Sequence, residues 1–347
     1  MPGLGVKSVQ RLLEAFGDPC AALAAPRALL ARVVGAELAA ALPHTVKPTA
    51  HRAMLDWLAQ PGNHFLPITD PRYPARLRDI ADAPPWLYVK GEPDLLGTPM
   101  LAIVGSRHAT AQGRRDAAAF ARSLAEAGLT IVSGLASGID TAAHEGALAG
   151  GKSVAVVATG LDRVYPASNR ELAHRLADQG ALVSELPLGT PPRPGQFPRR
   201  NRIISGLALG VLVVEATLDS GSLITARLAA EQGREVFALP GSIHSPLSKG
   251  CHRLIREGAK LVECVEDVLE ELRWQWTPPA ANPSSDGNTA DAHRQRLLEL
   301  MGPDPVPLDR LVERSGLTVE DLSAMLLALE LDGRVACLPG GLYQRLY

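Results

Sequence analysis

Aromatic residues are scarce in this sequence. Phe, Tyr and Trp together make up 4% of its 347 residues, whereas the hydrophobic fraction is 46%. Aliphatic side chains must therefore build most of the core. A chain of this length is too long for one compact core, so we expect two or three domains. Charged residues, at 21%, are about as frequent as in ordinary globular proteins.

Cysteines are also few, and they lie far apart. The four are Cys20, Cys251, Cys264 and Cys337, and no C-x-x-C pair occurs. This spacing argues against a disulfide framework and against a zinc site, and it favours reduced thiols. The sequence has no signal peptide and no apolar run of membrane-spanning length. It therefore predicts a cytoplasmic protein with no membrane partner.

An excess of positive charge is missing as well. The formal net charge is −2, which excludes a protein that coats nucleic acid through bulk charge, so any polyanion has to bind locally. One local excess exists between Pro187 and Val214, where no acidic residue occurs. Its arginines are Arg193, Arg199, Arg200 and Arg202. We predict a basic patch here, and a solvated face is the alternative.

One aromatic ring lies among these arginines. Phe197 in that setting suits the stacking of a nucleic-acid base beside phosphate contacts. The same ring could instead anchor the segment in an apolar core. The sequence leaves both interpretations open.

Apolar runs and amphipathic stretches alternate regularly in the middle of the chain. Runs such as LAIVG, SVAVVATG and GVLVVEA are separated by helical patterns from Met100 onward. Continuous apolar strands of this kind indicate a parallel sheet that helices cover on both faces. We therefore predict an α/β fold with a doubly wound, mostly parallel Rossmann-like sheet over residues 100–273.

Smaller modules are expected on both sides of this sheet. Residues 1–65 have helical spacing and predict a helix-hairpin-helix or SAM-like module. Residues 66–99 predict a connector in which WLYVKG forms an edge strand. Residues 274–292 are rich in Pro, Ser, Asn and Ala and predict a flexible linker.

The last segment, residues 293–347, is typical of a winged helix, with three helical patterns followed by a hairpin. Its third helix contains no Lys or Arg between Thr318 and Gly333. A helix that reads DNA is expected to be basic on its exposed face. We therefore predict that this module binds protein rather than DNA.

The stretch GALAGGKS, residues 146–153, matches the phosphate-binding pattern G-x-x-x-x-G-K-[ST] of nucleoside triphosphatases. A working loop of that kind leaves a strand and opens a helix, so that free N–H groups face the phosphates. Here the order is reversed, because a predicted helix precedes the stretch and Lys152 enters a strand. We interpret the glycines as the end of a helix.

The dinucleotide pattern G-x-G-x-x-G is absent too. The first strand of the predicted sheet is followed by Gly105, Ser106 and Arg107, and a later turn places Gly221 and Ser222 at a helix start. Ligands of doubly wound sheets bind beyond the carboxyl ends of the strands, where N–H groups and an arginine can hold an anion. Plain helix capping is the alternative for the serines, and a solvated position is the alternative for Arg107.

Together these stretches resemble the DNA-processing protein A family (DprA, also called Smf). The resembling segments include GSR, SGLASGIDTAAHEGAL, TGLDRVYPASNREL, FPRRNRIISGL and SKGCHRLIREGAK, in the family's order. The resemblance implies a protein of natural transformation and recombination that binds single-stranded DNA. It further implies protection of the incoming strand, help in loading the RecA recombinase, and a homodimer formed through the Rossmann-like domain.

The resemblance also implies a set of DNA-contacting residues. Gly105, Ser106 and Arg107 match the family's G-S/A-R motif, and Phe197 matches the aromatic residue before its R-N-R segment. Arg200, Asn201 and Arg202 match R-N-R itself, Arg199 falls on a variable position, and Lys249 lies in the family's glycine-rich turn. With Gly221 and Ser222, these residues form the predicted nucleic-acid site.

We expect neither enzymatic turnover nor a cofactor or metal, because no catalytic or metal-spaced set emerges from the nine histidines. The alternative is a Rossmann-like nucleotide-processing enzyme similar to the phosphoribohydrolases. Those enzymes need a P-G-G-x-G-T-x-x-E turn, and the nearest stretch, LPGSIHSP, lacks the glutamate. Glu215 at a strand end would be the remaining acid. A pure interaction scaffold is a third possibility.

Overall fold

The computed structural model describes residues 5–42, 48–275, 296–298, 300–301, 306–331, 334–338 and 341–345. The chain divides into two compact units, residues 1–277 and residues 278–347. From residue 276 onward, the predicted linker lies outside the described residues. Within the described ranges, no helix is both long and apolar enough to cross a membrane.

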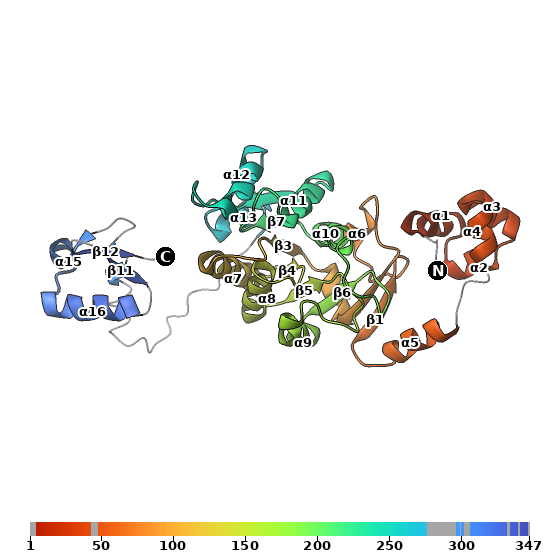
Figure 1. Cartoon of the computed structure of the whole chain (residues 1–347), viewed down its shortest axis with the longest axis horizontal. Coiled ribbons are helices and arrows are strands. Elements are labelled where there is room, and N and C mark those ends of the chain that lie inside the picture. Colours follow the sequence, from red (N-terminus) through yellow and green to blue (C-terminus); the bar gives the residue numbers. More distant parts are fainter. Residues whose placement is uncertain are drawn as a thin grey trace. The chain divides into compact units, whose positions relative to one another are not determined.

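A nine-stranded sheet forms the centre of the first unit (Figure 1). Its strand order is β1-β2-β6-β5-β4-β3-β7-β8-β9. The parallel strands are β3 (Met100–Val104), β4 (Thr130–Ser133), β5 (Ser153–Val156), β6 (Ala181–Ser184), β7 (Gly210–Val213), β8 (Glu235–Ala238) and β9 (Lys260–Leu261). The chain runs outward from β3 to β6 and then returns to β7 beside β3, so the predicted doubly wound fold is confirmed.

Helices cover both faces of this sheet because its central strands are apolar on both sides. In β3, Met100 and Ala102 face one apolar cluster, and Leu101 faces the other. The first face carries α6 (Ala75–Arg78), α10 (Gln196–Leu207), α11 (Gly221–Glu231) and α12 (Lys249–Arg256). The second face carries α7 (Ala111–Glu126), α8 (Ile139–Gly150), α9 (Arg170–Gln179) and α13 (Val265–Glu271). Short 3₁₀ turns, η2 (Pro93–Gly97), η3 (Ala167–Asn169) and η4 (Pro246–Ser248), lie in the connections.

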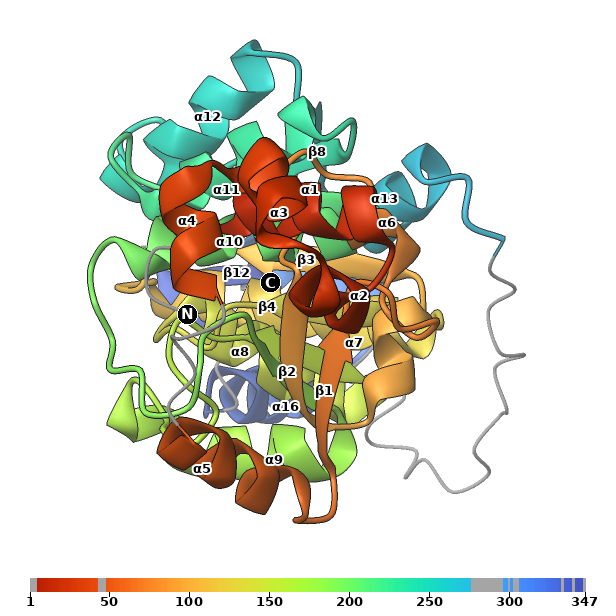
Figure 2. The same cartoon turned by 90° about the vertical axis from the view of Figure 1, so that its right-hand side faces the viewer.

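The prediction of WLYVKG as an edge strand is wrong. This segment is β2 (Trp86–Gly91), which pairs antiparallel with β6 on one side and with β1 (Asn63–Pro67) on the other. Figure 2 shows β1 and β2 side by side on the near side of the sheet. β1 also begins inside the range predicted as helical. It is short and ends in proline, which suits an outer strand because proline has no N–H to donate.

The segment predicted as a basic patch is the helix α10. Its residues from Arg200 to Leu207 are all buried. A helix that is buried on all sides shows no amphipathic period, which explains why the sequence pattern did not indicate a helix here. Arg200 and Arg202 are therefore carried into the molecule, whereas Arg193 and Arg199 remain exposed.

GALAGGKS ends a helix, as expected. α8 ends at Gly150 and β5 begins at Ser153. Between them, Lys152 is exposed and forms an ion pair with Glu92 at 2.9 Å. No helix begins at this loop, so it lacks the geometry that binds nucleotide phosphates.

Before the sheet, the chain forms helices α1 (Val6–Phe16), α2 (Pro19–Ala24), α3 (Arg27–Val34), α4 (Ala36–Ala41) and α5 (Pro48–Leu58). The Asp18 carboxylate accepts hydrogen bonds from the N–H groups of Cys20 and Ala21 and so caps α2. Gly35, with φ of +88°, separates α3 from α4. Leu12 and Leu30 are central in the small core of the first four helices.

In the second unit, a three-stranded sheet packs with helices as a winged helix does. Its elements are β10 (Val306–Pro307), α15 (Leu308–Ser315), α16 (Val319–Leu331), β11 (Val335–Leu338) and β12 (Leu342–Arg345). Leu297, Leu298 and Met301, from the first predicted helix, are buried in the same core as Leu322 and Leu326 of α16.

Close packing of α7 on α8 leads to a stability prediction. A side chain at Gly146 would overlap the backbone of Ala118 in α7. We expect Gly146→Ala to lower the free energy of unfolding by about 1–3 kcal/mol, as overpacking of a buried position does. Denaturant unfolding measures this. Glu145→Ala, on the exposed side of the same helix, is the control and should change stability by less than about 0.5 kcal/mol. Equal effects of the two changes would contradict the packing argument.

Candidate nucleic-acid interface

A small pocket of about 70 Å³ lies at the carboxyl ends of β3, β4 and β5. Parallel strands bring their carboxyl ends to one edge of the sheet, so residues far apart in the sequence meet there. The pocket is lined by Arg107, Gly134, Ala136, Ser137, Ala158, Thr159, Tyr165, Pro166, Phe197 and Arg200. Three of the predicted site residues are in this set: Arg107, Phe197 and Arg200.

Arg107 and Phe197 contact each other in this pocket. The guanidinium carbon of Arg107 lies 5.2 Å from the centre of the Phe197 ring, a cation–π distance. The Tyr165 ring lies on the same phenylalanine, with ring centres 5.7 Å apart. Arg107 and Tyr165 are exposed, and Phe197 is half-buried. The arrangement offers a charge for a phosphate next to rings on which a base can stack.

The turn after β3 is fixed by its two predicted residues, Gly105 and Ser106. A side chain at Gly105 would overlap Ile139 at the start of α8. The carbonyl of Ser106 accepts a hydrogen bond from the Ile139 N–H at 3.1 Å, and its hydroxyl accepts one from the His108 N–H at 3.1 Å. Gly105 and Ser106 thus position the turn, and the exposed Arg107 is the residue left to reach a ligand.

Arg200 lies beneath the pocket and is only 6% exposed. Its guanidinium donates to the carbonyls of Gly134, after β4, and of Val156, at the end of β5. Burial lowers the pKa of Arg200 to about 10, so the group stays charged at neutral pH. Burial also raises the pKa of Asp140, and the nearby Arg200 opposes that rise. The Nε atom of Arg200 is buried without a hydrogen-bond partner among the described residues.

The expectation that the remaining arginines form an unbalanced patch is wrong. Arg202 is 4% exposed and pairs with Glu185 at 2.6 Å and with Asp82 at 2.9 Å. The exposed Arg199 pairs with the same Glu185 at 3.0 Å. The acidic partners come from outside the acid-free segment, which is why the sequence did not reveal them. Arg202 and Arg199 neutralise a buried carboxylate and do not line the pocket.

The other predicted residues also lie outside the pocket. Asn201 is buried and donates to the Gly221 carbonyl at 3.3 Å. Ser222 is buried at the start of α11, where the Ser220 hydroxyl accepts from its N–H, so capping is the better interpretation. Lys249 is exposed and donates to the Ile243 carbonyl across its own turn. The structure therefore groups the predicted site around Arg107, Phe197 and Arg200.

Sequence reasoning overlooked Tyr165 and Thr159 as pocket residues. Both belong to the turn after β5, and Tyr165 is one of few aromatic residues in the chain. An exposed aromatic residue near a strand end, between glycine- and proline-rich stretches, was the available signal. Ser137, in the turn before α8, lines the pocket as well.

Glu215 is the candidate catalytic acid of the alternative enzyme function. Its carboxylate is hydrogen-bonded at the start of α7. Its carboxylate accepts hydrogen bonds from the Thr110 N–H at 2.9 Å and from the Thr110 hydroxyl at 2.6 Å. Gly113 lies directly against this carboxylate, because a side chain there would overlap it. Glu215 therefore caps a helix at the place where a dinucleotide-binding protein would hold a phosphate.

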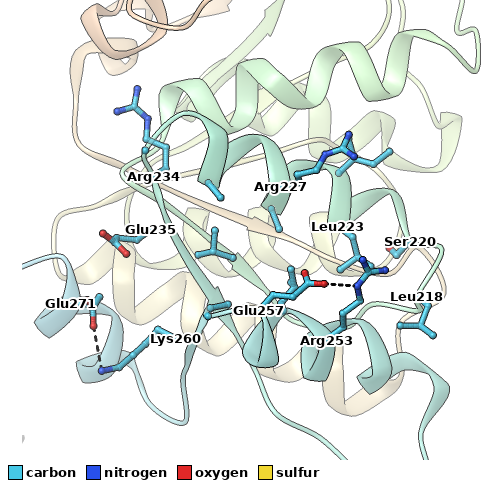
Figure 3. A pocket seen from close by; sticks show the side chains of 18 of the residues that line it. Leu218, Ser220, Leu223, Arg227, Arg234, Glu235, Arg253, Glu257, Lys260 and Glu271 are labelled. Atoms are coloured by element: carbon cyan, nitrogen blue, oxygen red, sulfur yellow. Dashed lines mark hydrogen bonds and ion pairs between the residues drawn. The ribbon is translucent and has the colours of Figure 1, made fainter.

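A second, larger hollow of about 880 Å³ lies against β8, α11 and α12 (Figure 3). Leu223 and Leu254 contribute apolar surface to it. Its cations, Arg227, Arg234, Arg253 and Lys260, are matched in number by the carboxylates Asp219, Glu235, Glu257 and Glu271. The pairs Arg253–Glu257, at 2.8 Å, and Lys260–Glu271, at 3.3 Å, are visible in Figure 3. This balance makes the hollow a poor path for a polyanion.

Known proteins resemble this chain in sequence and in fold. A profile of the family "DNA recombination-mediator protein A" matches residues 64–273, and one of the "DprA winged helix domain" matches residues 277–341. Protein Smf of Escherichia coli is 48% identical over 84% of this chain and 80% of its own length. DNA processing protein DprA of Streptococcus pneumoniae is 51% identical over 60% of this chain and 73% of its own length.

Two solved structures have the same fold as this chain. DNA processing protein A of Streptococcus pneumoniae superposes with a TM-score of 0.70 at 41% identity, covering 78% of this chain and 94% of that one. DNA processing protein A of Helicobacter pylori, described for its single-stranded DNA binding mode, superposes with a TM-score of 0.55 at 32% identity. That match covers 59% of this chain and 94% of the other.

The shared carboxylate of Glu185 allows a stability prediction with an internal control. Arg202→Ala leaves this buried carboxylate without its buried partner, and we expect a loss of about 3–5 kcal/mol in the free energy of unfolding. Arg199→Ala removes a pair whose arginine is half-exposed, and it should cost less than about 1 kcal/mol. Chemical denaturation of both variants measures the difference. A loss for Arg202→Ala no larger than that for Arg199→Ala would contradict a structural role for Arg202.

Proposed function

Because this chain belongs to the DNA recombination-mediator protein A family, we propose that it binds single-stranded DNA in natural transformation and recombination. Further parts of the proposal are that it protects the incoming strand in the cytoplasm and helps to load the RecA recombinase onto it. The relative from Helicobacter pylori, described for a single-stranded DNA binding mode, supports the choice of ligand.

The contact of Arg107 with Phe197 is the observation that carries this proposal. An exposed guanidinium and an accessible ring 5.2 Å apart can serve one nucleotide at once, the charge meeting a phosphate and the ring a base. Buried Arg200 adds positive potential beneath them. Since the chain has a net charge of −2, this edge of the sheet is where a polyanion gains attraction.

We further propose that the protein has no catalytic turnover. The candidate acid Glu215 is held by Thr110 at the start of α7, which leaves it poorly placed to transfer protons to a substrate. His144 is buried, hydrogen-bonded to Ser153 at 2.7 Å, and has a pKa that burial lowers to about 3. Release of free base from nucleoside monophosphates by the purified protein would instead favour the phosphoribohydrolase alternative.

We propose protein partners for the two surfaces that offer little to DNA. A homodimer through the Rossmann-like domain is supported by the hollow of Figure 3, whose apolar floor and equal numbers of both charges suit a second protein surface better than a polyanion. For the winged-helix module, α16 exposes Glu320, Asp321 and Glu330, which supports protein binding over DNA reading.

Binding across a salt series tests the site. If Arg107 meets a phosphate, Arg107→Ala should weaken binding of an oligothymidylate and reduce the slope of log affinity against log salt by ~0.7. Phe197→Ala should lose a stacking contact of about 1–3 kcal/mol while leaving the slope unchanged. Fluorescence anisotropy at several salt concentrations measures both quantities.

Lys152→Ala is the matched control for the loss of one positive charge. Lys152 is exposed and lies at the opposite, amino-terminal end of its strand, so its removal should leave affinity and slope close to those of the unaltered protein. Unchanged affinity and slope in both Arg107→Ala and Phe197→Ala, with the fold intact, would place the strand on another surface.

Deletion of residues 278–347 tests the winged-helix proposal. Since α16 is acidic, we expect the shortened chain to bind an oligothymidylate within about tenfold of the full chain, which is about 1.4 kcal/mol. Titration of both proteins at the same salt concentration measures this. A larger loss would make the module a DNA-binding element.

A further inference from the structure

Leu135 has an unusual backbone conformation in the wall of the pocket. Its φ is +61°, in the left-handed region that residues with a side chain rarely adopt. The side chain is 1% exposed and packs with Leu161 and Leu172 in an apolar cluster. Its neighbours Gly134 and Ala136 line the pocket. The left-handed turn thus sends one side chain into the core and presents its neighbours to the ligand.

Donors from distant parts of the chain hold this turn, which we call the pocket loop (Gly134–Ser137). Asn169 is 7% exposed, and its Nδ2 atom donates to the Leu135 carbonyl at 2.9 Å and to the Thr141 hydroxyl at 2.9 Å. The Thr141 hydroxyl in turn donates to the Ala136 carbonyl at 2.8 Å. With Arg200 on the Gly134 carbonyl, three successive carbonyls of the loop are each bound by a side chain.

We propose that Asn169 is a positioning residue for nucleic-acid binding, holding the pocket loop in its left-handed turn without touching the strand. The inference rests on the proposed function of the pocket. A strained conformation persists only where its surroundings fix it, and Asn169 supplies the donor at the strained residue itself. Without that donor the loop can relax, and its carbonyls become free to face and repel a phosphate.

Asn169 is distant from the pocket loop in the sequence. Asn169 precedes α9 and lies 34 residues from Leu135 in the sequence. It does not line the pocket, and the described hydrogen bonds of its side chain all go to the loop or to Thr141. Because the side-chain N–H groups of this buried asparagine hold one strained turn, its removal should change the position of the pocket residues in that turn.

The test compares Asn169→Ala with Asn63→Ala. Asn63 is also buried and also donates to a main-chain carbonyl, that of Trp57 at 2.8 Å, but it begins β1 far from the pocket in the strand order. At a temperature where both variants are folded, we expect Asn169→Ala to weaken oligothymidylate binding at least about tenfold. Asn63→Ala should remain within about twofold, with a comparable fall in Tm.

Asn169→Asp adds a second measurement, the pH dependence of binding, which a purely structural role of Asn169 would leave unchanged. The ionised carboxylate has the shape of the amide but cannot donate, whereas the protonated carboxyl can donate to the Leu135 carbonyl. The Kd ratio of variant to unaltered protein should therefore fall as the pH is lowered from about 8 to about 5.5, a window that burial of the carboxyl brings within reach. The other groups beside the loop, Asp140, Arg107, Arg200 and His144, are present in both proteins, so the ratio reports the effect of the introduced carboxyl.

The outcomes are distinguishable. Affinity within about twofold for both Asn169 variants, together with weakened binding by Arg107→Ala, overturns the positioning role and leaves the proposed site intact. Unchanged affinity in Arg107→Ala and in the Asn169 variants alike removes the site itself. If Asn169→Ala does not fold, Thr141→Val removes the half-buried end of the same chain of hydrogen bonds. It should then weaken binding, and unaltered affinity there would overturn the inference.

Discussion

The buried guanidinium of Arg200 is the constraint on which the rest of the pocket depends. The carboxyl edge of a parallel sheet gathers strand-end carbonyls, which need donors once a helix covers them. Arg200 satisfies two of these carbonyls, after β4 and at the end of β5, from a helix that packs across both strands. Desolvating a charge is costly, and the lowered pKa of Arg200 expresses that cost. Gly134 follows from this contact, because a side chain there would occupy the position of the guanidinium.

Because Arg200 is buried and bonded to main-chain carbonyls, few positive charges of residues 187–214 remain available to a ligand. Arg202 and Arg199 neutralise Glu185, and Arg193 remains exposed. Outside the segment, Arg107 keeps an exposed guanidinium over Phe197. The number of arginines in the sequence therefore overstates the charge that a ligand meets. If the proposed site binds DNA, so few free cations would release few counterions, and its affinity would depend less on salt than that of a strongly basic DNA-binding surface.

The parallel sheet was predictable because its strands are short apolar runs separated by amphipathic helices, a pattern that is local in sequence. α10 and β1 were not predictable in this way. Burial on all sides removes the amphipathic period of α10 from Arg200 onward, and β1 is a short strand that ends in Pro67. The position of Arg107 in the pocket was predictable, since the residue after the first strand of such a sheet lies at its carboxyl edge. The partners of Arg202 were not predictable, because Glu185 and Asp82 approach it only through the fold.

The aromatic residues at the pocket differ from those elsewhere on the sheet in remaining accessible. Most described rings near the sheet edge at β1 pack on one another: Trp57 on Tyr88, and Phe65 on Trp86. Tyr165 and Phe197 instead pair at the pocket, where Tyr165 remains 46% exposed. In a chain with only 4% aromatic residues, rings left accessible beside an unpaired arginine add little to the core. Under the proposed function, base stacking would give them a role that does not depend on sequence, since every base presents a flat face, and it would add affinity where the charge at this edge is sparse.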